Sequence, residues 1–110
     1  MGGFIKGDVV VIPFPFSDLT GNKKRPALVL SNLPGVDTIV CQITSKSKSD
    51  PYALPLEASD FASGGLPVSS YIRPNKIFTA DKNLILSVAG HLSELKINNI
   101  INSIIKIITS

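Results

Sequence analysis

The chain has 110 residues, of which 44% are hydrophobic and 17% charged, so it has the size and composition of one globular domain and not of a disordered chain. The formal net charge is +3, and the single cysteine excludes both an internal disulfide and a cysteine-rich zinc site. No signal peptide opens the chain, and no apolar run reaches the roughly 18 residues of a membrane span. These features predict a soluble, cytoplasmic protein.

The first half of the chain predicts a set of short strands. Apolar runs rich in Val and Ile, bounded by Pro, Gly and turn residues, occupy residues 9–16, 27–30 and 38–44. The third run is expected inside the sheet, with Cys41 filling core space. Residues 52–56 contain Pro55, which lacks a backbone donor and therefore predicts a strand at the edge of a sheet.

The second half predicts further strands and one helix. Residues 58–65 indicate a loop or a short helical turn, 67–73 and 76–79 indicate two strands separated at Pro74-Asn75, and 84–92 is an apolar segment without a clear pattern. Ser93 is a natural helix N-cap. After it, isoleucines recur at spacings of three and four, which predicts one apolar helix face packed on the sheet: Ile97, Ile100, Ile101, Ile104, Ile105 and Ile108. The expected fold is mainly β, a small and strongly curved antiparallel sheet or barrel with a C-terminal helix.

Seven of the eleven basic residues form three clusters with no acid inside them: Lys23, Lys24 and Arg25; Lys46 and Lys48; Arg73 and Lys76. Three acids, Asp50, Glu57 and Asp60, are grouped apart from them. If the three clusters converge in the fold they form a positive patch suited to a polyanion; the alternative is that they scatter over the surface. No His, Cys, Asp or Glu cluster has the spacing of metal ligands, so no metal site is expected.

Arg25 stands out within the first cluster. Pro26 biases its backbone towards an extended conformation, as at the first residues of a strand. The guanidinium group is thus expected at a strand mouth below a basic loop, where it suits a phosphate; the alternative is an ordinary solvated loop end.

Three motifs together carry a resemblance to a known family: G-D-V-V at residues 7–10, P-F-P-F at 13–16 and R-P-A-L-V-L at 25–30. In this order and spacing they resemble the opening of the MazF/PemK toxins of toxin–antitoxin pairs, most of which are RNA endonucleases. The resemblance continues over nearly the whole chain, as a single domain of residues 1–110. It implies an SH3-like barrel.

The resemblance also implies a set of site residues. Arg25, Thr44 and Arg73 match positions linked to catalysis in the family, and Asn75 stands where PemK-like members have an aspartate. Residues beside these positions are expected to contact RNA: Lys23, Lys24, Ser45, Lys46, Asn75 and Lys76. Asp81 is expected to have a structural role in the turn before Leu84.

The function implied is metal-independent, sequence-specific cleavage of single-stranded RNA, in which a 2′-hydroxyl attacks the adjacent phosphate and leaves a 2′,3′-cyclic phosphate. No cofactor is expected. The expected partners are RNA, a cognate antitoxin and a second copy of the chain, with no membrane. Two alternatives stay open: a CcdB-like toxin that poisons DNA gyrase through its C-terminal helix region, and an RNA-binding barrel that does not cleave.

Overall fold

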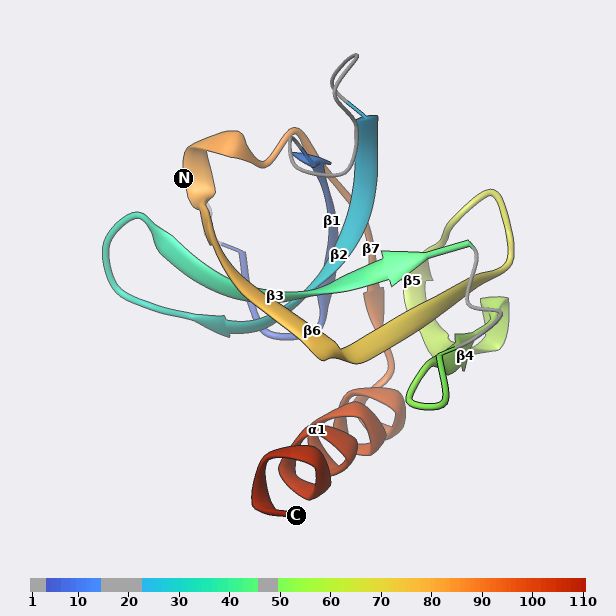
Figure 1. Ribbon diagram of the computed structural model, residues 1–110. Helices are drawn as coiled ribbons and strands as arrows, with labels where there is room; N and C mark the ends of the chain where they lie inside the picture. The colour runs from blue at the N-terminus through green and yellow to red at the C-terminus, as the bar shows by residue number, and fades with distance from the viewer. Residues whose placement is uncertain (1–3, 15–22, 46–49) are drawn as a thin grey trace.

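The computed structural model describes residues 4–14, 23–45 and 50–110. Within these ranges, seven strands form one antiparallel sheet that curls into a half-barrel, with one helix beneath it (Figure 1). The strands are β1 (Asp8–Phe14), β2 (Lys23–Asn32), β3 (Asp37–Thr44), β4 (Leu54–Leu56), β5 (Phe61–Gly64), β6 (Ser70–Asp81) and β7 (Ser87–Leu92). The helix is α1 (Glu94–Thr109), and two short 3₁₀ turns are η1 (Ala58–Asp60) and η2 (Lys82–Leu84). The mainly β architecture expected from the sequence is confirmed.

The strand order is β4-β6-β3-β2-β1-β7-β5. The third strand predicted from the sequence, β3, lies between β6 and β2, so its interior place is confirmed. The edge position predicted from Pro55 is also confirmed, because β4 pairs with β6 alone.

The prediction of a loop or helical turn over residues 58–65 is only half right. Residues 58–60 form η1, but Phe61–Gly64 is strand β5, which pairs with β7. Its sequence lacks the apolar alternation of a strand. Gly64 lies opposite Gly90, and the two backbones approach so closely that a Cβ atom at either position would collide with the other strand. The pairing of β5 with β7 therefore depends on two glycines that let the backbones approach, and an apolar pattern in the sequence does not predict it.

The two separate strands predicted for residues 67–73 and 76–79 are one continuous strand, β6. Arg73 lies opposite Gln42 and Ile77 opposite Cys41, so residues 74–76 have no partner across the ladder. Pro74 lacks the backbone donor that a ladder requires. A bulge absorbs it, and β6 bends at this point without ending (Figure 1).

Apolar residues pack on both faces of the sheet. On the face that α1 covers, the buried side chains are Val9, Leu28, Cys41, Ile43, Leu56, Ile72 and Leu92, joined by Ile97 and Ile100 of α1. On the opposite face they are Val10, Ile12, Ala27, Val29, Val40 and Ala80. Each fully buried Val, Leu or Ile contributes about 1.5–3 kcal/mol relative to an exposed one. Cys41 is completely buried as predicted, and this burial raises the pKa of its thiol to about 12.

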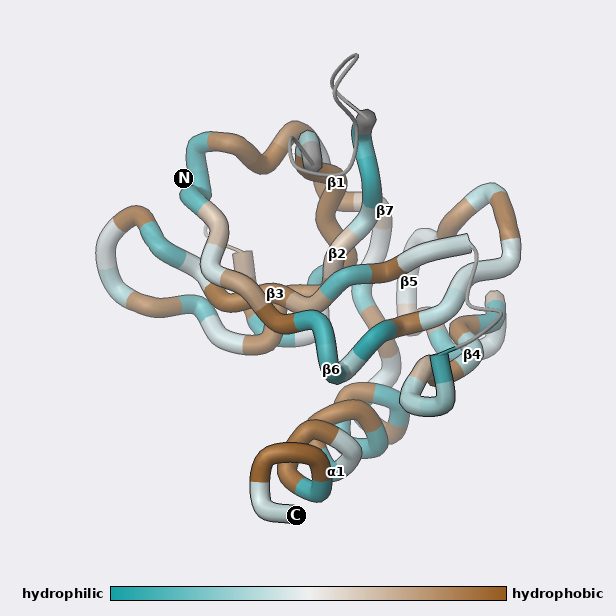
Figure 2. The backbone as a smooth tube through the Cα atoms, viewed as in Figure 1, coloured by the Kyte–Doolittle hydropathy of each residue, from teal (hydrophilic) through white to brown (hydrophobic). Residues whose placement is uncertain are grey.

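The helix begins as predicted and outruns the sheet. The Ser93 side chain accepts a hydrogen bond from the backbone N–H of Lys96 (3.2 Å), so Ser93 is the N-cap. Ile97 and Ile100 are buried, but the prediction that Ile105 and Ile108 pack on the sheet is wrong, because they are 49% and 69% exposed. In Figure 2 the apolar colour continues to the last turn of α1, beyond the sheet.

Candidate functional site

The three residues predicted to be catalytic lie on one face of the sheet. Gln42 of β3 lies opposite Ala27 of β2 and opposite Arg73 of β6, and these strands are neighbours. Arg25 lies two residues before Ala27 on β2, and Thr44 lies two residues after Gln42 on β3. Side chains alternate along a strand, so Arg25, Thr44 and Arg73 belong to the face opposite α1, together with Ala27. The side chains that face this way at the ends of the three strands, Arg25, Gln42, Thr44, Tyr71 and Arg73, are called the Arg25 surface below.

Arg25 is held near the start of β2, as Pro26 predicted. It lies directly opposite Ile12 of β1, whose side chain is only 3% exposed. Its Nε atom is buried and has no hydrogen-bond partner among the described residues. A buried donor without a partner costs about 1–3 kcal/mol, more when the group is charged. An anion that accepts a hydrogen bond from Nε would remove this cost.

Thr44 and Ser45 close the third strand. Thr44 is 8% exposed and lies opposite Tyr71, while Ser45 is exposed. The last printed pair of β2 and β3 at this end is Ala27 with Gln42, so Arg25 and Thr44 lie just beyond it on the two strands. Both residues line the same cavity, although they come from different strands.

Four of the predicted site residues line a common cavity of about 340 Å³: Lys24, Arg25, Thr44 and Ser45. Apolar residues from β1, β2 and β3 complete this side, and the segment from Leu66 to Val68, with Ser70, forms the opposite wall. Neighbouring residues such as Thr44 and Ser45, whose side chains alternate between the two faces of the sheet, both belong to the lining, so the cavity borders the strand ends. The lining residues include two cations and two hydroxyl groups. These polar groups are all suited to phosphate or ribose oxygens.

Arg73 has an acidic partner that the sequence did not indicate. Its Nε donates a hydrogen bond to Oδ2 of Asp50 at 2.6 Å, and the Asp50 side chain is 7% exposed. Burial alone would raise the pKa of Asp50, but hydrogen bonds from Arg73 and from the Tyr52 N–H, with the charges of Arg73 and Lys76, outweigh it and lower that pKa. The expectation that the acids lie apart from the basic clusters is therefore wrong for Asp50.

The other residues predicted to contact RNA are spread over a wider part of the surface than the cavity. Lys24, Asn75 and Lys76 are exposed, and Asn75 and Lys76 lie in the bulge of β6, outside the lining of the 340 Å³ cavity. Lys46 and the side chain of Lys23 lie outside the described residues. Arg25 of the first cluster and Arg73 of the third share one face of the sheet, and the Asp50 carboxylate is a partial counter-charge to Arg73 and Lys76.

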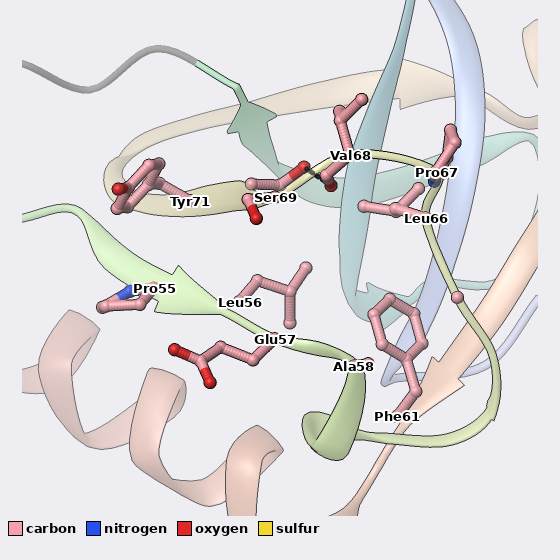
Figure 3. Close-up of a pocket in the computed structure, with 12 residues that line it drawn as sticks. Pro55, Leu56, Glu57, Ala58, Phe61, Leu66, Pro67, Val68, Ser69 and Tyr71 are labelled. Atoms are coloured by element: carbon pink, nitrogen blue, oxygen red, sulfur yellow. Dashed lines mark hydrogen bonds between the residues drawn. The ribbon is translucent and has the colours of Figure 1, made fainter.

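A second cavity of about 540 Å³ lies beside the first, and no motif in the sequence indicates it. Figure 3 shows it between β4 and η1 on one side and residues 66–71 on the other. Leu66, Pro67, Val68 and Ser70 line both cavities, so this segment is the wall between them. The Ser70 hydroxyl donates a hydrogen bond to the Val68 carbonyl (3.0 Å) and fixes the turn. The segment is therefore part of the site, although it carries no charge.

Tyr71 was also missed. It lines the second cavity and lies opposite Thr44, two residues from Arg73 on the same strand and therefore on the same face. This i, i+2 spacing of an aromatic and an arginine is visible in the sequence as Y-I-R, and it would have placed Tyr71 on the Arg25 surface.

Two other polar residues have structural roles. Asp81 accepts a hydrogen bond from the Asn83 N–H (2.8 Å) and caps η2, as expected for the turn before Leu84. His91 Nδ1 lies 2.9 Å from Asp8 Oδ1, where β7 pairs with the start of β1, and neither residue lines the 340 Å³ cavity. Asp8 also accepts a hydrogen bond from the Ile5 N–H (3.0 Å), so the G-D motif fixes the entry into β1.

No group of three or more His, Cys, Asp or Glu residues in the described ranges is arranged to hold a metal ion. The same ranges contain no helix long and apolar enough to span a membrane.

Comparison with solved structures gives several matches over nearly the whole chain. An endoribonuclease in complex with its cognate antitoxin, from a Mycobacterial species, matches with a TM-score of 0.77 and 17% identity, over 97% of this chain and 96% of that one. MazF from Deinococcus radiodurans (Form-I) matches with a TM-score of 0.76 and 20% identity, over 100% of both chains. A MazE-MazF structure (Form-II) from the same organism gives 0.74 and 18%, over 98% and 97%. At these identities the likeness establishes the fold.

A search of curated protein sequences gives no significant match. A family model, however, matches residues 5–108, which include every described residue of the site. The chain therefore belongs to the family of PemK-like, MazF-like toxins of type II toxin–antitoxin systems.

Proposed function

We propose that this protein is a metal-independent, sequence-specific endoribonuclease that cleaves single-stranded RNA as the toxin of a toxin–antitoxin pair. The observation that carries the proposal is the buried Arg25 Nε, which has no partner among the described residues, in a residue that lines a cavity together with a second cation and two hydroxyl-bearing residues. The fold shared with structures described as endoribonucleases supports the same function.

The reaction needs no external nucleophile. The ribose 2′-oxygen attacks the adjacent phosphorus and gives up its proton, the bond from phosphorus to the 5′-oxygen breaks, and the leaving 5′-oxygen takes up a proton. The products are a 2′,3′-cyclic phosphate and a 5′-hydroxyl end. The protein has to orient the phosphodiester, stabilise the additional negative charge on the phosphoryl oxygens and pass protons between the two oxygens.

Arg25 is suited to the charge. Its guanidinium is planar, stays protonated and donates paired hydrogen bonds to phosphate oxygens. A protonated guanidinium is a poor base, since its pKa exceeds about 12. Thr44, beside Arg25, supplies a hydroxyl that can donate and accept and is the candidate for passing a proton. Arg73 adds a second positive charge on the same face.

The remaining predicted residues bind the RNA around the cut. Lys24 and Ser45 line the cavity itself, and Asn75 and Lys76 project from the bulge of β6 nearby. Lys23 belongs to the first basic cluster of the sequence, together with Lys24 and Arg25, and Lys46 belongs to the second. An acidic segment of a cognate antitoxin would compete for these cations, and a second copy of the chain would extend the groove.

The test is incubation of the purified protein, with EDTA present, on a long single-stranded RNA and on its all-deoxy counterpart. We expect discrete cuts in the RNA alone, with 2′,3′-cyclic phosphate ends. Arg25→Ala should lower the cleavage rate by about 10²–10³-fold, as for loss of one preorganised donor. Lys106→Ala removes an exposed cation from α1 and is the matched control, expected to cleave like the wild type. Intact RNA, or cleavage of the DNA, would overturn the proposal.

A toxin that acts by binding is the second candidate, and the end of α1 favours it. Ile105 and Ile108 are exposed beyond the sheet, as a helix that docks on another protein would require. In this case Ile108→Asp abolishes growth inhibition in bacteria and Arg25→Ala retains it. The endoribonuclease proposal requires the opposite pattern.

A further inference from the structure

The Asp50 carboxylate has a fixed position because both of its oxygen atoms are engaged. Oδ1 accepts a hydrogen bond from the Tyr52 N–H at 2.9 Å, and Oδ2 accepts one from Arg73 Nε at 2.6 Å. The Ala53 N–H donates to the Asp50 carbonyl (3.3 Å), so the carboxylate sits on a closed turn. This turn joins directly to β4, which pairs with β6, the strand that carries Arg73.

The pair joins a well-buried acid to a more accessible arginine. The Asp50 side chain is 7% exposed and that of Arg73 is 26% exposed. Because a guanidinium is planar, a hydrogen bond at Nε fixes the plane and leaves the two terminal amino groups directed elsewhere. Among the described residues, Nε is the atom of Arg73 that the ion pair engages.

We propose that Asp50 is a positioning residue for RNA cleavage, which holds the Arg73 guanidinium so that its terminal amino groups face the scissile phosphate on the Arg25 surface. The proposal rests on the endoribonuclease function proposed above. A free arginine side chain at this position would sample several rotamers, and Asp50 restricts them before the substrate binds.

Asp50 does not itself exchange a proton with the RNA. Both oxygen atoms already accept hydrogen bonds, and the Asp50 side chain is only 7% exposed, whereas that of Arg73 is 26% exposed. Its effect on the reaction therefore passes through Arg73. This distinguishes a positioning residue from a general base, and it can be measured.

The experiment compares kcat and KM on an RNA whose cut site has been mapped with the wild-type protein, using Asp50→Ala, Arg73→Ala and the double variant. We expect Asp50→Ala to lower kcat at least tenfold with KM changed less, since a misplaced group weakens transition-state contacts more than ground-state binding. In the Arg73→Ala background, removing Asp50 should change kcat less than twofold, because the residue it positions is already absent.

Asp60→Ala is the matched control. Asp60 also accepts a hydrogen bond from a turn N–H (Glu57, 2.8 Å) and pairs with a cation (Lys96 Nζ, 3.5 Å), but its partner lies on α1. It should lower the melting temperature without lowering kcat. If Asp50→Ala does not fold, Asp50→Asn carries the same comparison, because it keeps the shape and one acceptor.

Each outcome separates the two proposals. RNA cleavage by the wild type with full kcat in Asp50→Ala, or with additive losses in the double variant, overturns the positioning role and leaves the endoribonuclease intact. Absence of cleavage by the folded wild type overturns the endoribonuclease and the positioning role together.

Discussion

The two arginines of the Arg25 surface differ in how the fold satisfies them. Arg25 has a buried Nε without a partner among the described residues, whereas Arg73 is paired with a nearly buried carboxylate. The unpartnered Nε of Arg25 therefore costs stability in the free protein. The ion pair of Arg73 is expected to contribute to stability instead.

This difference predicts a pH-dependent effect of Arg73→Met on stability. The pair lowers the pKa of Asp50 in the folded protein, so its contribution is present above the pKa of an unfolded Asp, about 3.9, and is lost as the pH falls through the lower folded value. Between pH 5 and 7 we expect Arg73→Met to lower the unfolding free energy by about 1–2 kcal/mol, reduced by the partial exposure of Arg73.

Thermal unfolding of both proteins from neutral to acidic pH measures this. The difference in melting temperature between the two proteins should be constant near neutral pH. It should fall towards zero in acid, where Asp50 is protonated in both proteins. The His91–Asp8 pair is the same in both proteins and cancels in the difference. A difference that stays constant down to the lowest pH would show that Asp50 is not the group involved.

At the scale of elements, the close approach of β5 and β7 is the most sensitive contact. A Cβ atom added at Gly90 would lie 2.6 Å from the Ser63 carbonyl oxygen and 2.8 Å from Phe61 Cδ2. Gly90→Ala should therefore separate the two strands and destabilise the fold by about 1–3 kcal/mol, as for overpacking. The Gly65 N–H also bonds to the Ala89 carbonyl (3.1 Å), so the wall of the cavity that begins at Leu66 should loosen as well.

Hydrogen exchange of the amides in residues 61–65, together with the melting temperature, checks this prediction. Gly65→Ala is the matched control, because a Cβ at that position meets nothing within 4 Å. Equal effects of the two substitutions would mean that chain flexibility, and not strand contact, is what Gly90 provides.

The sequence predicts the elements that have a local apolar pattern and misses those that depend on contacts between distant residues. Strands β1, β2 and β3 follow from their apolar, β-branched runs. The place of Arg25 at the start of a strand follows from Pro26, whereas the choice of Arg25 and Thr44 as site residues comes from the family resemblance. Strand β5 has no such signal, because two glycines on different strands create it. The sequence predicts a break between two strands at Pro74, where the structure has a bulge within one strand. A proline removes a ladder hydrogen bond in a break and in a bulge alike, so the sequence does not distinguish them. The Asp50–Arg73 pair spans 23 residues of sequence and depends on the path of the chain between them.

At the scale of the whole molecule, an apolar strip of three large side chains, at and just before the start of β7, remains exposed. Leu84, Leu86 and Val88 are 51%, 54% and 49% exposed. Val88 lies opposite Val10, and Val10 lies opposite Ala27, so Val88 is on the same face as the Arg25 surface. Two strand spacings, about 10 Å, separate it from β2. A chain of this size buries a limited core of its own. The strip is therefore suited to a second copy of the chain.

We expect the protein to be a homodimer at micromolar concentration, joined through this strip, and Leu86→Asp to convert it to a monomer that retains its fold. Light scattering with size-exclusion chromatography measures both states. Ile105→Asp, at an equally exposed position on α1, should remain dimeric. If dimerisation extends the RNA-binding groove across both copies, the Leu86→Asp monomer should bind a long RNA more weakly than the dimer, although its Arg25 surface is unchanged. A wild-type monomer, or a dimer disrupted by Ile105→Asp and unaffected by Leu86→Asp, would place the interface elsewhere and confine the groove to one chain.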